Sequence, residues 1–317
     1  MKKLPEETKV KLRKLENELQ LAVGSGATER AAEIAGQIQV LFGDDRKHHR
    51  LLRAKLWAFE AALDANRLAY AESGFVGIRK LAGSTTRLYL EASSLLAVCL
   101  LRQKNIGKAK RLIREVISKI NNIKSDRTRN QFQKRLITRI EEECILTELI
   151  GKDDGKLDEQ EIHEKAVQLI QQNSEDEILK LIGNSVPASG VLLLREVREY
   201  SILRLPAPDQ KLLPAPKDAE KPKNIGKKAL AVLRRVGWKT LCNPDSEIYK
   251  LWSKRIPKVF NQGYFAAAIV STMNGLSIGI PLLASGVLAT VMKYSAEEFC
   301  ELAKPKGLMI PRGEKES

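Results

Sequence analysis

Histidine is the side chain best suited to acid–base catalysis near neutral pH, and this chain of 317 residues has three, His48, His49 and His163. His48 and His49 are adjacent in a stretch of helical periodicity, where successive side chains point about 100° apart and are poorly placed to share a metal ion. His163 stands alone in the sequence. We therefore expect no catalytic residue, no metal ligand and no cofactor, and we expect that the chain is not an enzyme.

The absence of common enzyme motifs leads to the same expectation. The sequence has no phosphate-binding loop, no dinucleotide-binding fingerprint, no nucleophile elbow and no zinc-protease motif. Residues 154–161 place a glycine, an apolar residue and a glutamate at the spacing of the second half of a calcium-binding EF-hand loop. The first two ligand positions of that loop hold Ile150 and Lys152, which supply no carboxylate. We interpret the segment as a turn between two helices.

The four cysteines, Cys99, Cys144, Cys242 and Cys300, lie far apart in the sequence. They include no C-x-x-C pair, and no histidine stands at zinc-ligand spacing from them. We interpret all four as buried thiols in a reducing compartment. The N-terminus begins with two lysines after Met1 but lacks the apolar segment that a secretory signal needs. We therefore expect a cytoplasmic protein.

The chain carries a net charge of +15. Residues 102–139 hold thirteen lysines and arginines against two acidic residues, and a second basic stretch covers residues 217–239. Such a positive surface attracts nucleic acid, an anionic membrane or an acidic protein. Phe132 is the one aromatic residue in 102–139, so we expect contacts to a nucleic-acid backbone rather than stacking on bases. The candidate polyanion-binding residues are Lys104, Lys108, Lys110, Arg111, Arg114, Lys119, Arg127, Arg129, Arg234 and Arg235.

A run of 34 residues without a formal charge, Val259 to Met292, is the most unusual segment of this basic chain. Asn274-Gly275 and Gly279-Ile280-Pro281 divide it into two arms, and each arm is shorter than the ~20 apolar residues that cross a bilayer as a helix. Two interpretations remain open: a helical hairpin packed in a domain or against a protein partner, or an element that enters a membrane. The candidate partner-binding or membrane-binding residues are Ala268, Ile269, Leu276, Ile280, Leu283 and Val287.

Composition predicts an all-α fold. Aromatic residues make up only 5% of the chain, while leucine, isoleucine and alanine dominate the apolar set, which is typical of helices. Apolar periodicity predicts helices over residues 5–23, 28–42, 46–71 and 75–81. Residues 191–205 form an apolar stretch that fits either a strand or a helix, because it is too short for periodicity to decide.

Residues 87–120 resemble one helical hairpin of the tetratricopeptide repeat family. Two alanines, Ala97 and Ala109, let the two antiparallel helices cross closely, while Leu100 and Ile113 fill the groove beside the crossing. The hairpin departs from the family pattern at Ser93, where an aromatic residue is usual, and at Asn121, where a proline is usual. The residues that carry the resemblance are Leu96, Ala97 and Leu100 on the first helix and Ala109, Ile113 and Val116 on the second. The resemblance implies an irregular array of helical pairs over about residues 28–150, with a concave surface that binds partners.

A proline-rich segment divides the chain. Leu205-Pro206-Ala207-Pro208 and Leu213-Pro214-Ala215-Pro216 favour an extended backbone and disfavour a helix. We predict a helical repeat-like domain over 1–204, a linker over 205–224, and a small C-terminal helical module over 225–317 that contains the apolar hairpin. The function that we expect is a non-enzymatic scaffold or adaptor that binds a protein partner within a larger assembly. Two alternatives are a membrane-acting effector that uses the hairpin and a sequence-tolerant nucleic-acid-binding protein.

Overall fold

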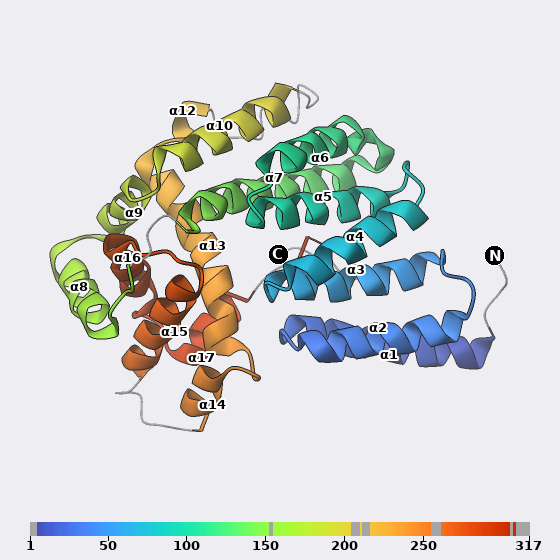
Figure 1. Cartoon of the computed structure of the whole chain (residues 1–317), viewed down its shortest axis with the longest axis horizontal. Coiled ribbons are helices and arrows are strands. Elements are labelled where there is room, and N and C mark those ends of the chain that lie inside the picture. Colours follow the sequence, from blue (N-terminus) through green and yellow to red (C-terminus); the bar gives the residue numbers. More distant parts are fainter. Residues whose placement is uncertain are drawn as a thin grey trace. The chain divides into compact units, whose positions relative to one another are not determined.

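A computed structural model of the chain describes residues 5–151, 155–203, 210, 216–254, 261–304 and 307–308 (Figure 1). Within these residues every regular element is a helix and no β-strand is formed, which confirms the all-α fold class. The chain divides into two compact units: unit 1 comprises Met1–Leu136 with Lys306–Ser317, and unit 2 comprises Ile137–Pro305. The boundary at residue 136 therefore falls inside one long helix, α7.

The first six helices of unit 1 form an antiparallel stack in which each one packs against the next in the chain (Figure 1). The first helices of successive hairpins also pack together, α1 against α3 and α3 against α5. Helices α1, α2, α4 and α6 each bury one apolar stripe, as amphipathic helices do, whereas every residue of α5 from Leu90 to Arg102 is buried. The helices are α1 (Glu6–Gly24), α2 (Thr28–Phe42), α3 (His49–Asp64), α4 (Leu68–Leu81), α5 (Arg87–Arg102), α6 (Ile106–Ser118), the 3₁₀ turn η1 (Ile120–Asn122) and the first half of α7 (Asp126–Leu149).

The turns that join α1 to α2, α3 to α4 and α5 to α6 share one backbone geometry. Each turn contains one residue with positive φ: Gly26 at 75°, Asn66 at 59° and Lys104 at 59°. In each turn the backbone N–H of the following residue donates a hydrogen bond to the carbonyl group five residues before it. These bonds join Ala27 to Ala22, Arg67 to Ala62 and Asn105 to Leu100, at distances of 2.9, 2.9 and 2.8 Å.

The three hairpins also bury equivalent residues. The turn residue advances by 40 positions from Gly26 to Asn66 and by 38 positions from Asn66 to Lys104. The same two offsets relate the fully or nearly fully buried leucines 12, 52 and 90, and the fully buried alanines 31, 71 and 109. Unit 1 therefore contains three successive copies of one helical hairpin. Their spacing is longer than the 34-residue period of tetratricopeptide repeats, and membership of that family stays a prediction.

The predicted helix over residues 46–71 was wrong, because the chain turns at Asn66 and forms α3 and α4 instead. The periodic apolar pattern runs through this turn without a glycine or a proline to interrupt it. Asparagine is among the few residues other than glycine that adopt a left-handed backbone readily. The turn therefore carries a weaker sequence signal than the Gly-Ser-Gly turn between α1 and α2.

Unit 2 is built around α16, whose residues Leu283–Val291 are all buried. Helices α8, α9 and α15 pack on α16, and α13 packs on α9 and α15. The segment for which the sequence left strand and helix open forms the helix α10. The helices are α8 (Glu159–Gln172), α9 (Glu175–Asn184), α10 (Ala188–Leu203), α12 (Pro216–Ala219), α13 (Pro222–Cys242), α14 (Glu247–Trp252), α15 (Asn261–Gly275), α16 (Pro281–Val291) and α17 (Ala296–Leu302).

The predicted linker over 205–224 lies mostly outside the described residues. In its C-terminal part, residues 216–219 form α12, and α13 begins at Pro222, a position in the first helical turn that tolerates proline. The two compact units divide the chain at residue 136, away from the predicted boundary. The linker and the three-part organisation therefore stay predictions.

Helices α9 and α13 approach so closely at two glycines that their backbones touch. A Cβ atom on Gly226 would lie 1.9 Å from the carbonyl oxygen of Leu179, and one on Gly183 would lie 1.9 Å from that of Pro222. Backbone atoms cannot move aside as a flexible side chain does, so only glycine fits at either position. A third glycine, Gly286 on α16, lies against the side chain of Ile182 on α9.

We expect Gly226→Ala to lower the free energy of unfolding of unit 2 by about 3 kcal/mol, because the new methyl group forces α9 and α13 apart. Gly237→Ala is the matched control on the same helix, since nothing lies within 4 Å of a Cβ atom there. Removal of a mid-helix glycine favours folding by about 0.5–1 kcal/mol, so the control should be neutral or stabilising. Urea denaturation of both variants measures the difference, and equal effects would contradict the close crossing.

Candidate functional site

The exposed side of α6 carries the densest group of candidate cations in unit 1. Helix α6 buries Ala109, Ile113, Val116 and Ile117 on one side. Its opposite side exposes three cations at intervals of three residues, and the turn before the helix exposes a fourth. We call Lys104, Lys108, Arg111 and Arg114 the basic α6 surface.

The other candidate cations of unit 1 have different surroundings. Lys110 is half-buried, and Arg127 is exposed. The Lys119 ammonium group lies 3.0 Å from Glu115 and 4.9 Å from the centre of the Tyr89 ring. Arg129 pairs with Asp126 at 2.5 Å and donates a hydrogen bond to the Ile123 carbonyl. Lys119 and Arg129 are thus held by contacts within the unit.

A half-buried polar cluster ties α4, α5 and α6 together beneath this surface. The Arg79 guanidinium donates hydrogen bonds to the Tyr89 hydroxyl at 2.8 Å, to Glu115 at 2.9 Å and to Ser93 at 2.8 Å. The Tyr89 hydroxyl donates to Glu115 at 2.5 Å. Burial acts to raise the pKa of Glu115, but the hydrogen bonds from Tyr89 and Lys119 and the charge of Arg79 outweigh it, and the pKa is lowered. The cluster therefore fixes α6 in place with an ionised carboxylate.

The two candidate cations of the second basic stretch, Arg234 and Arg235, point into unit 2. Arg234 donates a hydrogen bond to the Thr290 carbonyl at 3.4 Å, and burial lowers its pKa. Arg235 pairs with Glu142 at 2.5 Å and lies 3.8 Å from Glu143. These contacts hold both guanidinium groups within unit 2.

Arg235 belongs to a buried charge network around three consecutive glutamates of α7, residues 141–143, each at most 5% exposed. Glu141 binds the Arg198 guanidinium at 2.9 Å and the Lys228 ammonium at 2.6 Å. Glu143 binds Arg139 at 3.0 Å on the same helix. Burial raises the pKa of Glu142, although the nearby arginines act to lower it. The network links α7 to α10 and α13 by charges that are shielded from water.

The apolar hairpin lies within unit 2. Helix α15 ends at Gly275 and α16 begins at Pro281, at the two predicted breaks. Of the candidate residues, Ala268, Ile269, Leu283 and Val287 are buried, and Leu276 and Ile280 are half-buried. Within the described parts of the chain, no single helix is both long enough and apolar enough to cross a membrane. Helices α9 and α10, which meet at an angle of 94°, reach that length and apolar composition only when they are taken together.

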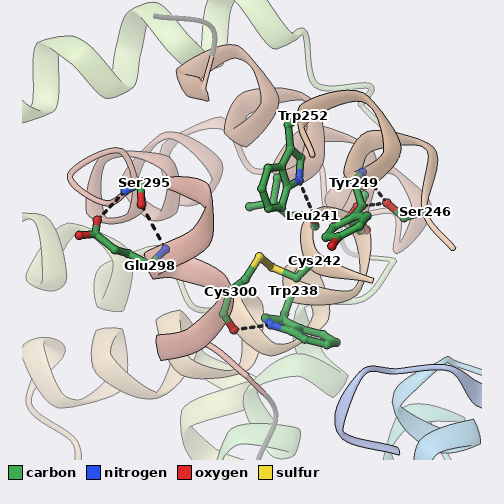
Figure 2. The surroundings of a disulfide bond; sticks show 10 residues. Trp238, Leu241, Cys242, Ser246, Tyr249, Trp252, Ser295, Glu298 and Cys300 are labelled. Atoms are coloured by element: carbon green, nitrogen blue, oxygen red, sulfur yellow. Dashed lines mark hydrogen bonds between the residues drawn. A yellow bond between two sulfur atoms is a disulfide. The ribbon is translucent and has the colours of Figure 1, made fainter. Parts of the chain in front are cut away.

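Two cysteines form a disulfide, which corrects the interpretation of all four as thiols. Cys242 at the end of α13 is bonded to Cys300 on α17 (Figure 2), whereas Cys99 and Cys144 are buried free thiols. Two tryptophans flank the bond: the Trp238 indole N–H donates to the Cys300 carbonyl at 2.8 Å, and the Trp252 indole N–H donates to the Leu241 carbonyl at 2.7 Å. The two cysteines are 58 residues apart, which matches no short cysteine motif, so the pair could not be predicted from the sequence.

Helix α17 begins with a capping box next to this disulfide. The Ser295 hydroxyl accepts a hydrogen bond from the Glu298 backbone N–H, and the Glu298 carboxylate accepts one from the Ser295 N–H (Figure 2). This short helix is thus held at its start by reciprocal caps and at its end by the disulfide.

His48 and His49 lie at the start of α3, where the contacts of His48 support the fold. His48 caps α3 by accepting a hydrogen bond from the Arg50 N–H at 3.3 Å, and its ring stacks between those of Phe42 and His49. Among the described residues, no group of three or more histidine, cysteine, aspartate and glutamate side chains is arranged to hold a metal ion.

No family model, no curated protein and no solved structure matches the chain.

Proposed function

We propose that the chain is a non-enzymatic helical scaffold that binds a protein partner through unit 1. The observation that carries this proposal is the three-fold recurrence of one hairpin, with the same turn and the same buried leucine and alanine. Stacked helical hairpins present a long continuous surface, and proteins built in this way commonly bind other proteins. A tetratricopeptide-like ancestry and a place in a larger assembly belong to the same proposal.

The partner surface that we favour is the basic α6 surface. Its cations are exposed, and the Arg79 cluster holds the helix that carries them. Clustered exposed cations speed association with an acidic surface and select for it. The proposed partner is therefore a protein with an acidic face. In the nucleic-acid alternative, the same cations bind the phosphates of the nucleic acid.

We expect the triple substitution Lys108→Glu, Arg111→Glu and Arg114→Glu to abolish capture of a stoichiometric acidic partner while the chain stays folded. Affinity purification followed by mass spectrometry measures this outcome. Lys11→Glu, Arg13→Glu and Lys14→Glu on α1 form the matched control, because they reverse three exposed cations of unit 1 away from α6. Equal recovery of the partner with both triple variants would contradict the proposed surface.

Nuclease treatment and a salt titration separate the nucleic-acid alternative from the protein partner. Binding through phosphates releases counterions, so the affinity should fall steeply with salt and should weaken in the α6 triple variant. Binding that nuclease abolishes identifies a nucleic acid, and binding that survives nuclease supports the protein partner. Cytoplasmic location is part of the proposal, although the disulfide between Cys242 and Cys300 favours an oxidising compartment. Free thiols at both positions in cells would support the cytoplasm, and a disulfide there would contradict it.

The membrane alternative requires the apolar hairpin to leave the core of unit 2, because α16 is buried there against α8 and α9. Flotation with vesicles that contain anionic lipid tests it. Recovery with the vesicles after a high-salt wash would favour the membrane-acting effector. Recovery in the soluble fraction would favour the scaffold.

A further inference from the structure

Glu60 on α3 is a deeply buried carboxylate, with 3% of its surface exposed. A carboxylate in such a place needs hydrogen-bond donors to offset the loss of water. One donor comes from the other end of the chain: the backbone N–H of Leu308 donates to Glu60 Oε1 at 2.6 Å, across 248 residues of sequence. The two partners belong to the same compact unit, although α17 just before Leu308 belongs to unit 2.

The segment that carries this N–H fits closely against Glu60. Leu308 is 4% exposed although it stands outside any helix, so its side chain is enclosed as fully as those of the core. A Cβ atom on the preceding residue, Gly307, would lie 3.1 Å from Glu60 Oε2, a tighter contact than side chains usually tolerate. A glycine before a leucine therefore lets the backbone approach the carboxylate.

The acid at position 60 is not required by the stacking of the hairpins. With the offsets of 40 and 38 residues, its equivalents are Gln20 in the first hairpin and the fully buried Val98 in the third. A valine fills the equivalent position in α5, so helix packing alone is satisfied by an apolar residue. The carboxylate is specific to the middle hairpin, where a main-chain donor faces it.

We propose that Glu60 is the centre of a peptide-binding site in unit 1, and that the chain's own Gly307-Leu308 segment is its ligand. The carboxylate recognises a backbone N–H, the missing side chain at the glycine allows close approach, and the leucine is enclosed. This site does not involve the basic α6 surface. A partner that uses it carries a Gly-Leu segment and must displace Gly307-Leu308.

Hydrogen exchange of the full chain tests the docking of the segment. The Leu308 amide should exchange at least 10-fold more slowly in the wild type than in Glu60→Val, since a buried hydrogen bond contributes about one factor of ten in the local opening equilibrium. Valine is the residue found at the equivalent position 98, so the variant should fold, and unchanged protection of amides in α3 checks this. A Leu308 amide that exchanges equally fast in both proteins overturns the proposal.

Peptide binding tests the site itself. The probe is a labelled peptide with the sequence of residues 303–312, and the expected order of affinity follows from competition with the attached segment. Leu308→Asp places a second carboxylate near Glu60 and should free the site, so this variant should bind the peptide at least 10-fold more tightly than the wild type. The double variant Glu60→Val, Leu308→Asp should lose that gain. Equal binding to all three proteins overturns the proposal, as does equal binding of a control peptide with valine in place of the glycine.

Discussion

Reduction of the disulfide between Cys242 and Cys300 should lower the free energy of unfolding of unit 2 by about 4 kcal/mol. The bond closes a loop of 58 residues that contains α14, α15 and α16. In the chain-entropy description, a cross-link over a loop of this length removes conformational freedom from the unfolded chain worth about 4 kcal/mol. Because α16 is the centre of unit 2, the decrease in the free energy of unfolding should apply to the whole unit.

Guanidinium denaturation followed by tryptophan fluorescence measures this effect. Trp238 and Trp252 flank the bond in unit 2, and Trp57→Phe removes the tryptophan of unit 1 from the signal. The unfolding midpoint should fall when reductant is added to this protein. The double variant Cys242→Ser, Cys300→Ser should start from the lower midpoint and should not respond to reductant. A wild-type midpoint that is insensitive to reductant would show that the bond does not support unit 2.

Sequence reasoning could predict the parts of this fold whose signals are local. The all-α class followed from composition, and the two breaks between the arms of the apolar hairpin followed from Gly275 and Pro281. The resemblance of residues 87–120 to a helical hairpin predicted a turn between Leu100 and Ala109, and α5 and α6 are joined there. The equivalent turn at Asn66 was missed, since its apolar pattern continues from α3 into α4 without a glycine or a proline.

The parts that were missed depend on contacts between distant residues. Glu141, Glu142 and Glu143 form a run of three charges, and such a run is usually solvated. Their burial depends on Arg198 and on two cations of α13, and these partners lie 57 to 93 residues away in the sequence. Ile140 and Cys144 border the run, and this apolar setting is the one local sign that it enters a core. The Glu60 site and the disulfide have no local sign of comparable strength.

Glu141→Ala should destabilise unit 2 by about 3–5 kcal/mol, because it leaves the buried charges of Arg198 and Lys228 without their shared carboxylate. The Arg198 guanidinium and the Glu141 carboxylate are each about 5% exposed, so water cannot replace the lost partner. Glu161→Ala on α8 is the matched control in the same unit. Its exposed pair with Lys165 at 2.5 Å is of the surface type that contributes at most about 1 kcal/mol.

The double substitution Glu141→Leu, Arg198→Met separates the cost of a broken pair from the value of an intact one. Replacement of a whole buried ion pair by apolar residues of similar size is often neutral or stabilising. We therefore expect the double variant to recover most of the stability that Glu141→Ala loses, with Lys228 able to extend its ammonium group toward solvent because it is 22% exposed. Chemical denaturation of the two variants and the control decides the matter. If the double variant is as unstable as Glu141→Ala, the charges of the network stabilise unit 2. If it recovers, apolar packing of α7 against α10 replaces the ion pair, and the charges add little to the stability of unit 2.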